Sequence, residues 1–133
     1  MKILLIEDSR FLRLAGERAL TKAGHQVFST IDGEEGLRLA REHKPDLVIL
    51  DLMLPKLSGP EVLRAIRTNP EIAKTPVMVL TSLPQCNEQK LMGEGATSYF
   101  QKSRLKLDRD TAPFVQEVES MILGLSKRKA AGR

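Results

Sequence analysis

Acidic, hydroxyl and ammonium side chains stand at the ends of four apolar runs of this sequence. Glu7 and Asp8 follow "KILLI", Asp51 follows "DLVIL", Thr81 follows "PVMVL" and Lys102 comes shortly after "TSYF". The three carboxylates, with no His or Cys beside them, are oxygen-only ligands, which favour a hard cation such as Mg²⁺. Mg²⁺ usually completes its coordination shell with waters and phosphate oxygens. These residue types therefore predict a site for a phosphoryl group.

Each of these side chains has a role in phosphoryl chemistry and an ordinary structural alternative. Asp51 is the candidate nucleophile, because an aspartate can form an acyl phosphate. Lys102 offers a compact positive charge to phosphoryl oxygens, and Thr81 offers a hydroxyl donor. Taken singly, Asp51 could cap a turn, Lys102 could be a surface lysine, and acids often lie at a helix start. Their joint placement favours the functional interpretation.

Five apolar runs and the segments between them predict the scaffold that would hold these side chains. The runs lie at residues 2–6, 25–30, 46–50, 76–80 and 97–100. Their continuous Val, Ile and Leu character predicts strands that are covered on both faces. Helical periodicity marks residues 9–24, 32–44, 59–70, 84–95 and 112–125, with Ser9 and Asp32 as N-caps. Strands that alternate with helices predict an α/β fold with a parallel sheet, which binds ligands beyond the carboxyl ends of its strands.

Length and composition favour one cytoplasmic domain. A chain of 133 residues can bury a single core. No apolar run approaches the roughly 18 residues of a membrane span, and the N-terminal run is too short for a signal peptide. Cys86 has no second cysteine to pair with, which fits a reducing compartment.

The positive net charge of +4 belongs to the C-terminal residues. Residues 1–126 carry 17 basic and 17 acidic side chains, whereas residues 127–133 carry four basic side chains and no acidic one. We therefore expect a domain at 1–126 and a basic tail, or the start of a linker, at 127–133. We do not expect this tail to bind nucleic acid directly, and we expect no DNA-binding or enzymatic domain in the residues after 126.

The ordered set of motifs resembles a known family. An acidic pair, an aspartate with a downstream Pro and Gly, a Thr and a Lys occur in order as Glu7-Asp8, Asp51 with Pro55 and Gly59, Thr81 and Lys102. The stretch "GATSYFQK" adds a GA…Y…K pattern. This combination resembles the receiver domain of two-component response regulators over nearly the whole chain. The resemblance implies a flavodoxin-like, doubly wound, five-stranded parallel sheet of order 2-1-3-4-5, flanked by five helices.

The resemblance also implies a function, which is a phosphorylation-controlled signalling switch. A sensor histidine kinase or a phosphotransfer protein would donate a phosphoryl group to Asp51, with Mg²⁺ as the cofactor. Asp8 and Asp51 would contact Mg²⁺ directly, Glu7 through water and Met53 through its backbone carbonyl.

Three further roles follow from the same resemblance. Thr81 would hydrogen-bond the phosphoryl group and Lys102 would pair with it. Tyr99 would be the switch aromatic, which turns inward when Thr81 moves and changes the partner-binding face. The output protein and the oligomeric state stay open, a homodimer included.

One departure from the family pattern concerns the segment after Lys102. Ser103 stands where the family usually has a proline, and residues 103–110 form a longer connection than usual.

Two alternatives to the switch follow from the residues. One is a Mg²⁺-dependent phosphohydrolase with an Asp nucleophile, which generally needs a second acid where this chain has Met53. The other is a degenerate receiver that binds partners without phosphorylation.

Overall fold

The five apolar runs form the five strands of one parallel sheet. A computed structural model describes residues 1–81, 88–102 and 111–131 of the chain. The strands are β1 (Lys2–Ile6), β2 (Gln26–Thr30), β3 (Leu47–Asp51), β4 (Val77–Thr81) and β5 (Ser98–Gln101). Their order, β2-β1-β3-β4-β5, confirms the predicted doubly wound topology. The predictions for Ser103 and for the connection 103–110 lie outside the described residues.

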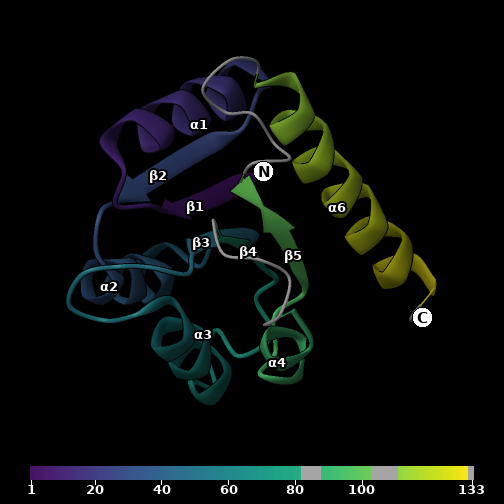
Figure 1. Ribbon diagram of the computed structural model, residues 1–133. Coiled ribbons are helices and arrows are strands. Elements are labelled where there is room, and N and C mark those ends of the chain that lie inside the picture. Colours follow the sequence, from purple (N-terminus) through teal and green to yellow (C-terminus); the bar gives the residue numbers. More distant parts are fainter. Residues whose placement is uncertain (82–87, 103–110, 132–133) are drawn as a thin grey trace.

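A helix occurs at each predicted helical segment. These are α1 (Arg10–Lys22), α2 (Gly33–His43), α3 (Gly59–Thr68), α4 (Glu88–Gly93) and α6 (Ala112–Ala131). Figure 1 shows α1 and α6 on one face of the sheet and α2, α3 and α4 on the other. The molecule thus has three layers, as right-handed crossovers between parallel strands require.

Side-chain caps start the helices that follow β1, β2 and β3. In each case a side-chain oxygen accepts a hydrogen bond from a backbone N–H three residues later, which would otherwise lack a partner. The pairs are Ser9 with Leu12, Asp32 with Glu35 and Ser58 with Glu61. The predicted caps Ser9 and Asp32 are confirmed.

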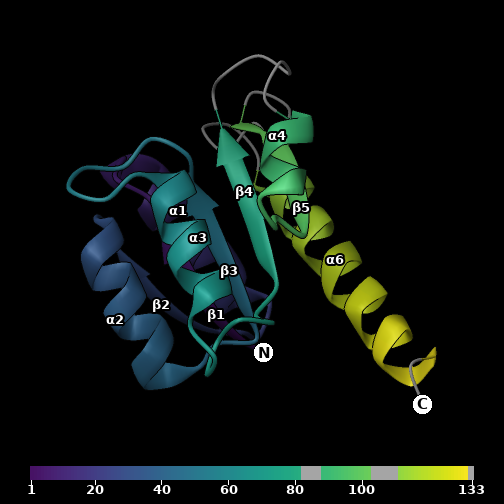
Figure 2. The same ribbon diagram turned by 90° about the horizontal axis from the view of Figure 1, so that it is seen from below.

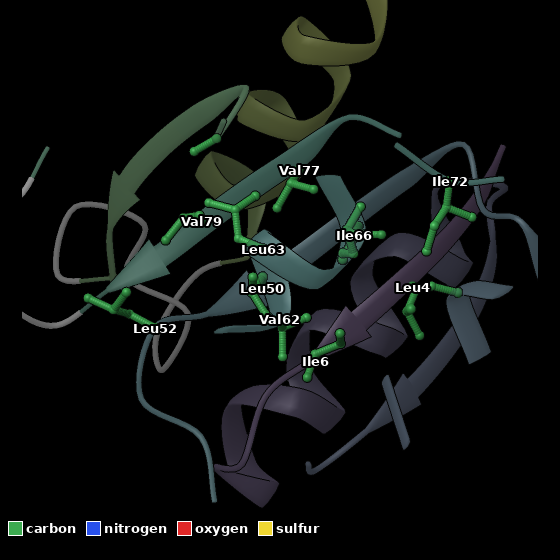
Figure 3. Close-up of a cluster of buried hydrophobic side chains, with 13 residues drawn as sticks. Leu4, Ile6, Leu50, Leu52, Val62, Leu63, Ile66, Ile72, Val77 and Val79 are labelled. Carbon is green, nitrogen blue, oxygen red and sulfur yellow. The ribbon is translucent and has the colours of Figure 1, made fainter. Parts of the chain in front are cut away.

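The strands are apolar on both sides because both faces of the sheet are covered. Successive side chains of a strand point to opposite faces, and those facing α2 and α3 form the cluster shown in Figure 3. This cluster contains Leu4, Ile6, Val48, Leu50, Val77 and Val79 from the sheet and Val62, Leu63 and Ile66 from α3. The opposite cluster contains Ile3, Leu5, Leu47, Ile49, Met78 and Leu80, covered by Leu20, Phe114 and Val118 from α1 and α6.

Helix α6 is longer than its apolar pattern indicates. The pattern predicts a helix over 112–125, whereas the helix continues to Ala131 and its C-terminal part extends beyond the sheet (Figures 1 and 2). The helix therefore passes through the predicted domain boundary at residue 126, which stays a prediction. Among the helices of the described residues, none is both long and apolar enough to cross a membrane.

Candidate functional site

The predicted site residues meet at the carboxyl edge of the sheet. Asp51 and Thr81 are the last residues of the neighbouring strands β3 and β4. Glu7 and Asp8 directly follow β1 on the other side of β3, and Lys102 follows β5. The parallel sheet thus brings together side chains that are up to 95 positions apart in the sequence.

Lys102 bridges two buried carboxylates. Its Nζ lies 2.7 Å from Glu7 Oε1 and 3.1 Å from Asp51 Oδ1. The side chains of Glu7 and Asp51 are 2% and 3% exposed, and that of Lys102 is 16% exposed. Backbone groups fix the carboxylates further, because Ser9 N–H donates to Glu7 Oε2 and Met53 N–H donates to Asp51 Oδ1.

The surroundings of Asp51 disfavour its charged form. Burial, then a hydrogen bond with Glu7 and the charge of Glu7, raise the pKa of Asp51 to about 8. The ammonium of Lys102 acts in the opposite direction but does not cancel these effects, and a hydrogen bond with Asp8 adds to them. Without a further cation, the Asp51 carboxyl therefore keeps its proton up to a higher pH than an ordinary aspartate does.

Lys102 keeps its charge in spite of its environment. Burial alone would lower the pKa of Lys102, but its hydrogen bond to Glu7 and the charges of Glu7 and Asp51 outweigh this effect. The net result is a raised pKa for Lys102. At neutral pH the site therefore holds a fixed ammonium beside an excess of acidic groups.

The acidic groups of the site fit a divalent metal ion. Ligand oxygens of Glu7, Asp8 and Asp51 lie within 4.8 Å of one another. Asp8 is exposed, so the cluster is open to solvent on one side, where a hollow is lined by Asp8, Met53 and Pro55 with their neighbours. Oxygen donors alone, with more acids than the one ammonium balances, are the ligand set of a hard cation such as Mg²⁺.

The remaining predicted residues lie around this cluster. Thr81 is fully buried at the end of β4. Met53 follows Asp51 by two positions, and its side chain points outward, 60% exposed. Tyr99 in β5 packs against the cluster that faces α3, and its hydroxyl group is buried without a hydrogen-bond partner among the described residues.

Two features of the site were not predicted from the sequence. The first is the direct ion pair between Glu7 and Lys102, since Glu7 was expected to act through water on a metal ion. The second is Thr30 at the end of β2, whose hydroxyl oxygen is buried and has no hydrogen-bond partner among the described residues. Thr30 O accepts a hydrogen bond from Glu7 N–H, which places this residue at the same edge of the sheet. No local sequence pattern indicates the ion pair between Glu7 and Lys102 or the buried hydroxyl of Thr30.

The family model described as "Response regulator receiver domain" matches residues 3–108. The chain belongs to the response regulator receiver domains. This match includes every site residue described above, from Glu7 to Lys102. The receiver domain is the regulatory module of two-component signalling, so the resemblance based on the motifs is confirmed.

Several known proteins are similar to this receiver domain in sequence or in fold. Transcriptional regulatory protein AfsQ1 of Streptomyces coelicolor is 46% identical over 80 residues, which cover 60% of this chain and 34% of AfsQ1. The chain thus spans about a third of the length of that relative. The chemotaxis protein CheY4 of Vibrio cholerae has a similar structure, with a TM-score of 0.79, 25% identity and coverage of 90% and 96% of the two chains. The Mn²⁺-bound response regulator Rcp1 has a TM-score of 0.76 at 31% identity, with coverage of 90% and 91%.

Proposed function

We propose that this receiver domain is a phosphorylation-controlled switch that accepts a phosphoryl group on Asp51. The observation that carries the proposal is the position of Asp51 itself, buried at the edge of the sheet and 3.1 Å from the ammonium of Lys102. The donor would be a histidine kinase or a histidine phosphotransfer protein, in the cytoplasm. An oxygen of Asp51 would bond to phosphorus while the P–N bond of phosphohistidine breaks, and the imidazole would leave with a proton from solvent.

The acidic cluster supports a requirement for Mg²⁺. Asp8 and Asp51 would hold the ion directly, Glu7 through water and Met53 through its backbone carbonyl. A bound Mg²⁺ supplies positive charge that favours the ionised form of Asp51, whose pKa is otherwise raised to about 8. The structure of Rcp1, a relative with the same fold, is that of a form bound to a divalent ion, Mn²⁺.

Lys102 and Thr81 would stabilise the transferred group. Glu7 holds the ammonium of Lys102 in place, so the lysine side chain is preorganised to neutralise phosphoryl oxygens. The Thr81 hydroxyl would donate a hydrogen bond to the same group, and Tyr99 would respond on the face of β5. The result would be a changed surface for an output protein or a second copy of the chain, and not repeated turnover of a substrate.

The proposal is tested by incubating the protein with Mg²⁺ and acetyl phosphate and measuring its intact mass. We expect a phosphate adduct in the wild type and in Asp46→Asn, and none in Asp51→Asn. Asp46 is a matched control, because it lies just before the same strand at the opposite edge and accepts a hydrogen bond from Lys2 N–H. An adduct retained by Asp51→Asn, or no adduct in a wild type that binds Mg²⁺, would overturn the assignment. Steady hydrolysis of an unrelated phosphomonoester would favour a phosphohydrolase instead.

A further inference from the structure

The first residue of α2 lies directly against the loop that follows Asp51. A Cβ atom added to Gly33 would come within 2.3 Å of the carbonyl oxygen of Leu57 and within 2.9 Å of the Leu57 Cβ. Val62 of α3 would be 2.7 Å away. Such contacts are far shorter than side chains tolerate, so only glycine lets the backbone of α2 approach the loop this closely.

The loop from Leu52 to Ser58 is closed at its base. Gly59 N–H donates a hydrogen bond of 3.0 Å to Leu52 O, and a Cβ at Gly59 would lie only 2.6 Å from the carbonyl oxygen of Asp51. Within the loop, Leu57 N–H donates to Pro55 O at 2.7 Å. Because both ends of the loop are fixed, a displacement at Leu57 must be taken up by the residues between Leu52 and Leu57.

Helix α2 is held more firmly than the loop. Its N-terminus is capped by Asp32, whose Oδ1 accepts from Glu35 N–H at 2.7 Å. One turn later, Gly36 packs tightly against Ile6 in β1, an internal strand that pairs with β2 and β3. A second link joins the two parts, because Lys56 Nζ lies 3.8 Å from Asp32 Oδ2, although this exposed lysine makes a weak pair. A bulkier residue at position 33 would therefore displace the loop and not the helix.

We propose that Gly33 is a positioning residue for the phosphoacceptor site. Its lack of a side chain sets the position of the 52–58 loop, and hence the position of the Met53 carbonyl beside Asp51. This inference rests on the proposed function, in which that carbonyl is a metal ligand. It assigns to α2, which contributes no side chain to the acidic cluster, an influence on metal binding and phosphorylation through the 52–58 loop.

The test compares Gly33→Ala with the wild type in Mg²⁺ titrations by calorimetry, using Mg²⁺ alone, and in adduct formation with acetyl phosphate. We expect Mg²⁺ affinity to fall by about tenfold, the size typical of changes in groups that orient metal ligands. Adduct formation should slow at low Mg²⁺ and recover in part at saturating Mg²⁺, because the ion can still bind to the displaced site.

Gly36→Ala is the matched control within the same helix. There the added Cβ meets the end of the Ile6 side chain, at 2.5 Å, and not the loop. We expect Gly36→Ala to change the melting temperature but to leave Mg²⁺ affinity within twofold of the wild type. If Gly33→Ala does not fold, Leu57→Ala loosens the loop with α2 intact, and it should also weaken Mg²⁺ binding.

The possible failures are distinguishable. A folded Gly33→Ala with the wild-type Mg²⁺ affinity overturns the positioning role. An equal loss of affinity in Gly36→Ala also overturns it. If only Leu57→Ala can be measured, an unchanged Mg²⁺ affinity in that variant overturns the positioning role. The proposed function survives each of these results. A wild type that binds Mg²⁺ but takes up no phosphoryl group overturns the proposed function, while the Mg²⁺ titrations still decide the role of Gly33.

Discussion

At the scale of single residues, the main feature is a carboxylate that is placed where its charge is unfavourable. Asp51 is buried beside Glu7, and the single ammonium of Lys102 forms ion pairs with both carboxyl groups. Burial and the neighbouring acid raise the pKa of Asp51 to about 8, from an ordinary value of 3.8. The folded protein therefore holds a proton on Asp51 at pH values where the unfolded chain has released it.

This difference predicts how stability changes with pH in metal-free protein. Because the folded-state pKa of Asp51 is raised, its contribution to the free energy of unfolding decreases as pH rises from about 4 to about 8. Asp51→Asn removes the titrating group. We expect the variant and the wild type to be nearly equal in stability at pH 4, and the variant to be more stable by several kcal/mol at pH 8, because each unit of raised pKa corresponds to about 1.4 kcal/mol. Urea unfolding in EDTA at both pH values measures the difference.

Asp46→Asn serves as the control for this measurement. Asp46 is exposed and caps the backbone N–H of Lys2, so its substitution should give no advantage that grows between pH 4 and pH 8. An Asp51→Asn variant that is less stable than the wild type at pH 8 would contradict the raised pKa. Saturating Mg²⁺ should reduce the stability advantage of Asp51→Asn over the wild type. The ion stabilises the folded wild type, which binds it through Asp51, more than it stabilises the variant.

The residue types of the site were predictable from the sequence, but their pairing was not. Strand ends are visible as the ends of apolar runs, and parallel strands bring those ends to one edge, so Asp51, Thr81 and Lys102 could be grouped in advance. The direct contact of Lys102 with Glu7 depends on the depth and rotamers of two side chains 95 positions apart. No local pattern encodes such a contact.

At the scale of elements, Arg67 connects α3 with the segments on both sides of β4. Its guanidinium donates to the carbonyl oxygens of Gly95, Ala73 and Thr75 at 2.9, 3.0 and 2.6 Å. It also donates to Thr97 Oγ1 at 3.4 Å. Burial lowers the pKa of Arg67, whose hydrogen-bond partners are neutral. One side chain thus fixes the end of α3, the turn before β4 and the connection from α4 to β5.

We predict that Arg67→Met lowers the free energy of unfolding by about 2 kcal/mol, because three carbonyl groups lose a charged donor. Arg67→Lys should be nearly as unfavourable, since an ammonium cannot reproduce the fork of a guanidinium. Chemical denaturation of both variants measures these effects.

Arg64→Met is the control on the same helix. The Arg64 side chain is 66% exposed and lies 4.0 Å from Glu94, so its loss should cost less than about 0.5 kcal/mol. Equal destabilisation by Arg64→Met and Arg67→Met would show that helix α3, and not the carbonyl contacts of Arg67, is responsible.

The elements themselves were largely predictable, with errors at their ends. Apolar runs gave all five strands to within one residue at each end. The runs are most continuous in β3 and β4, whose residues are buried on both faces of the sheet. The end of α6 was missed because its last residues lie beyond the apolar pattern. Lys, Arg and Ala are good helix formers without any packed face, so backbone propensity continues the helix where periodicity stops.

At the scale of the whole molecule, the proposed phosphoacceptor site is connected to Tyr99 through neighbouring strands. Thr81 ends β4 at the site, and Tyr99 lies in β5, paired with Val79 of β4. The buried Tyr99 hydroxyl has no hydrogen-bond partner among the described residues, so a ring position that gives it one would be favoured by a few kcal/mol at most. We therefore expect that a modest change at Thr81 shifts Tyr99 between two states.

The sequence offers a direct probe of this coupling, because Tyr99 is its single tyrosine and it has no tryptophan. Intrinsic fluorescence therefore reports on Tyr99 alone. We predict that Mg²⁺ and acetyl phosphate change this fluorescence in the wild type. Thr81→Val keeps the volume of the buried side chain but removes its hydroxyl group, so the variant should still form the Asp51 adduct while its fluorescence change falls by at least half.

The adduct must be quantified by intact mass in the same samples, so that a smaller signal is not mistaken for less phosphorylation. Thr21→Val, at an exposed position of α1, is the control and should retain both the adduct and the full fluorescence change. If Thr81→Val forms the full adduct and still shows the full wild-type change in fluorescence, then Tyr99 does not respond to Thr81 and the coupling is refuted. If the wild type forms the adduct without any change in fluorescence, then Tyr99 keeps the same position in both states. In that case the altered surface must arise elsewhere, and the helices that flank β5 become the elements to examine.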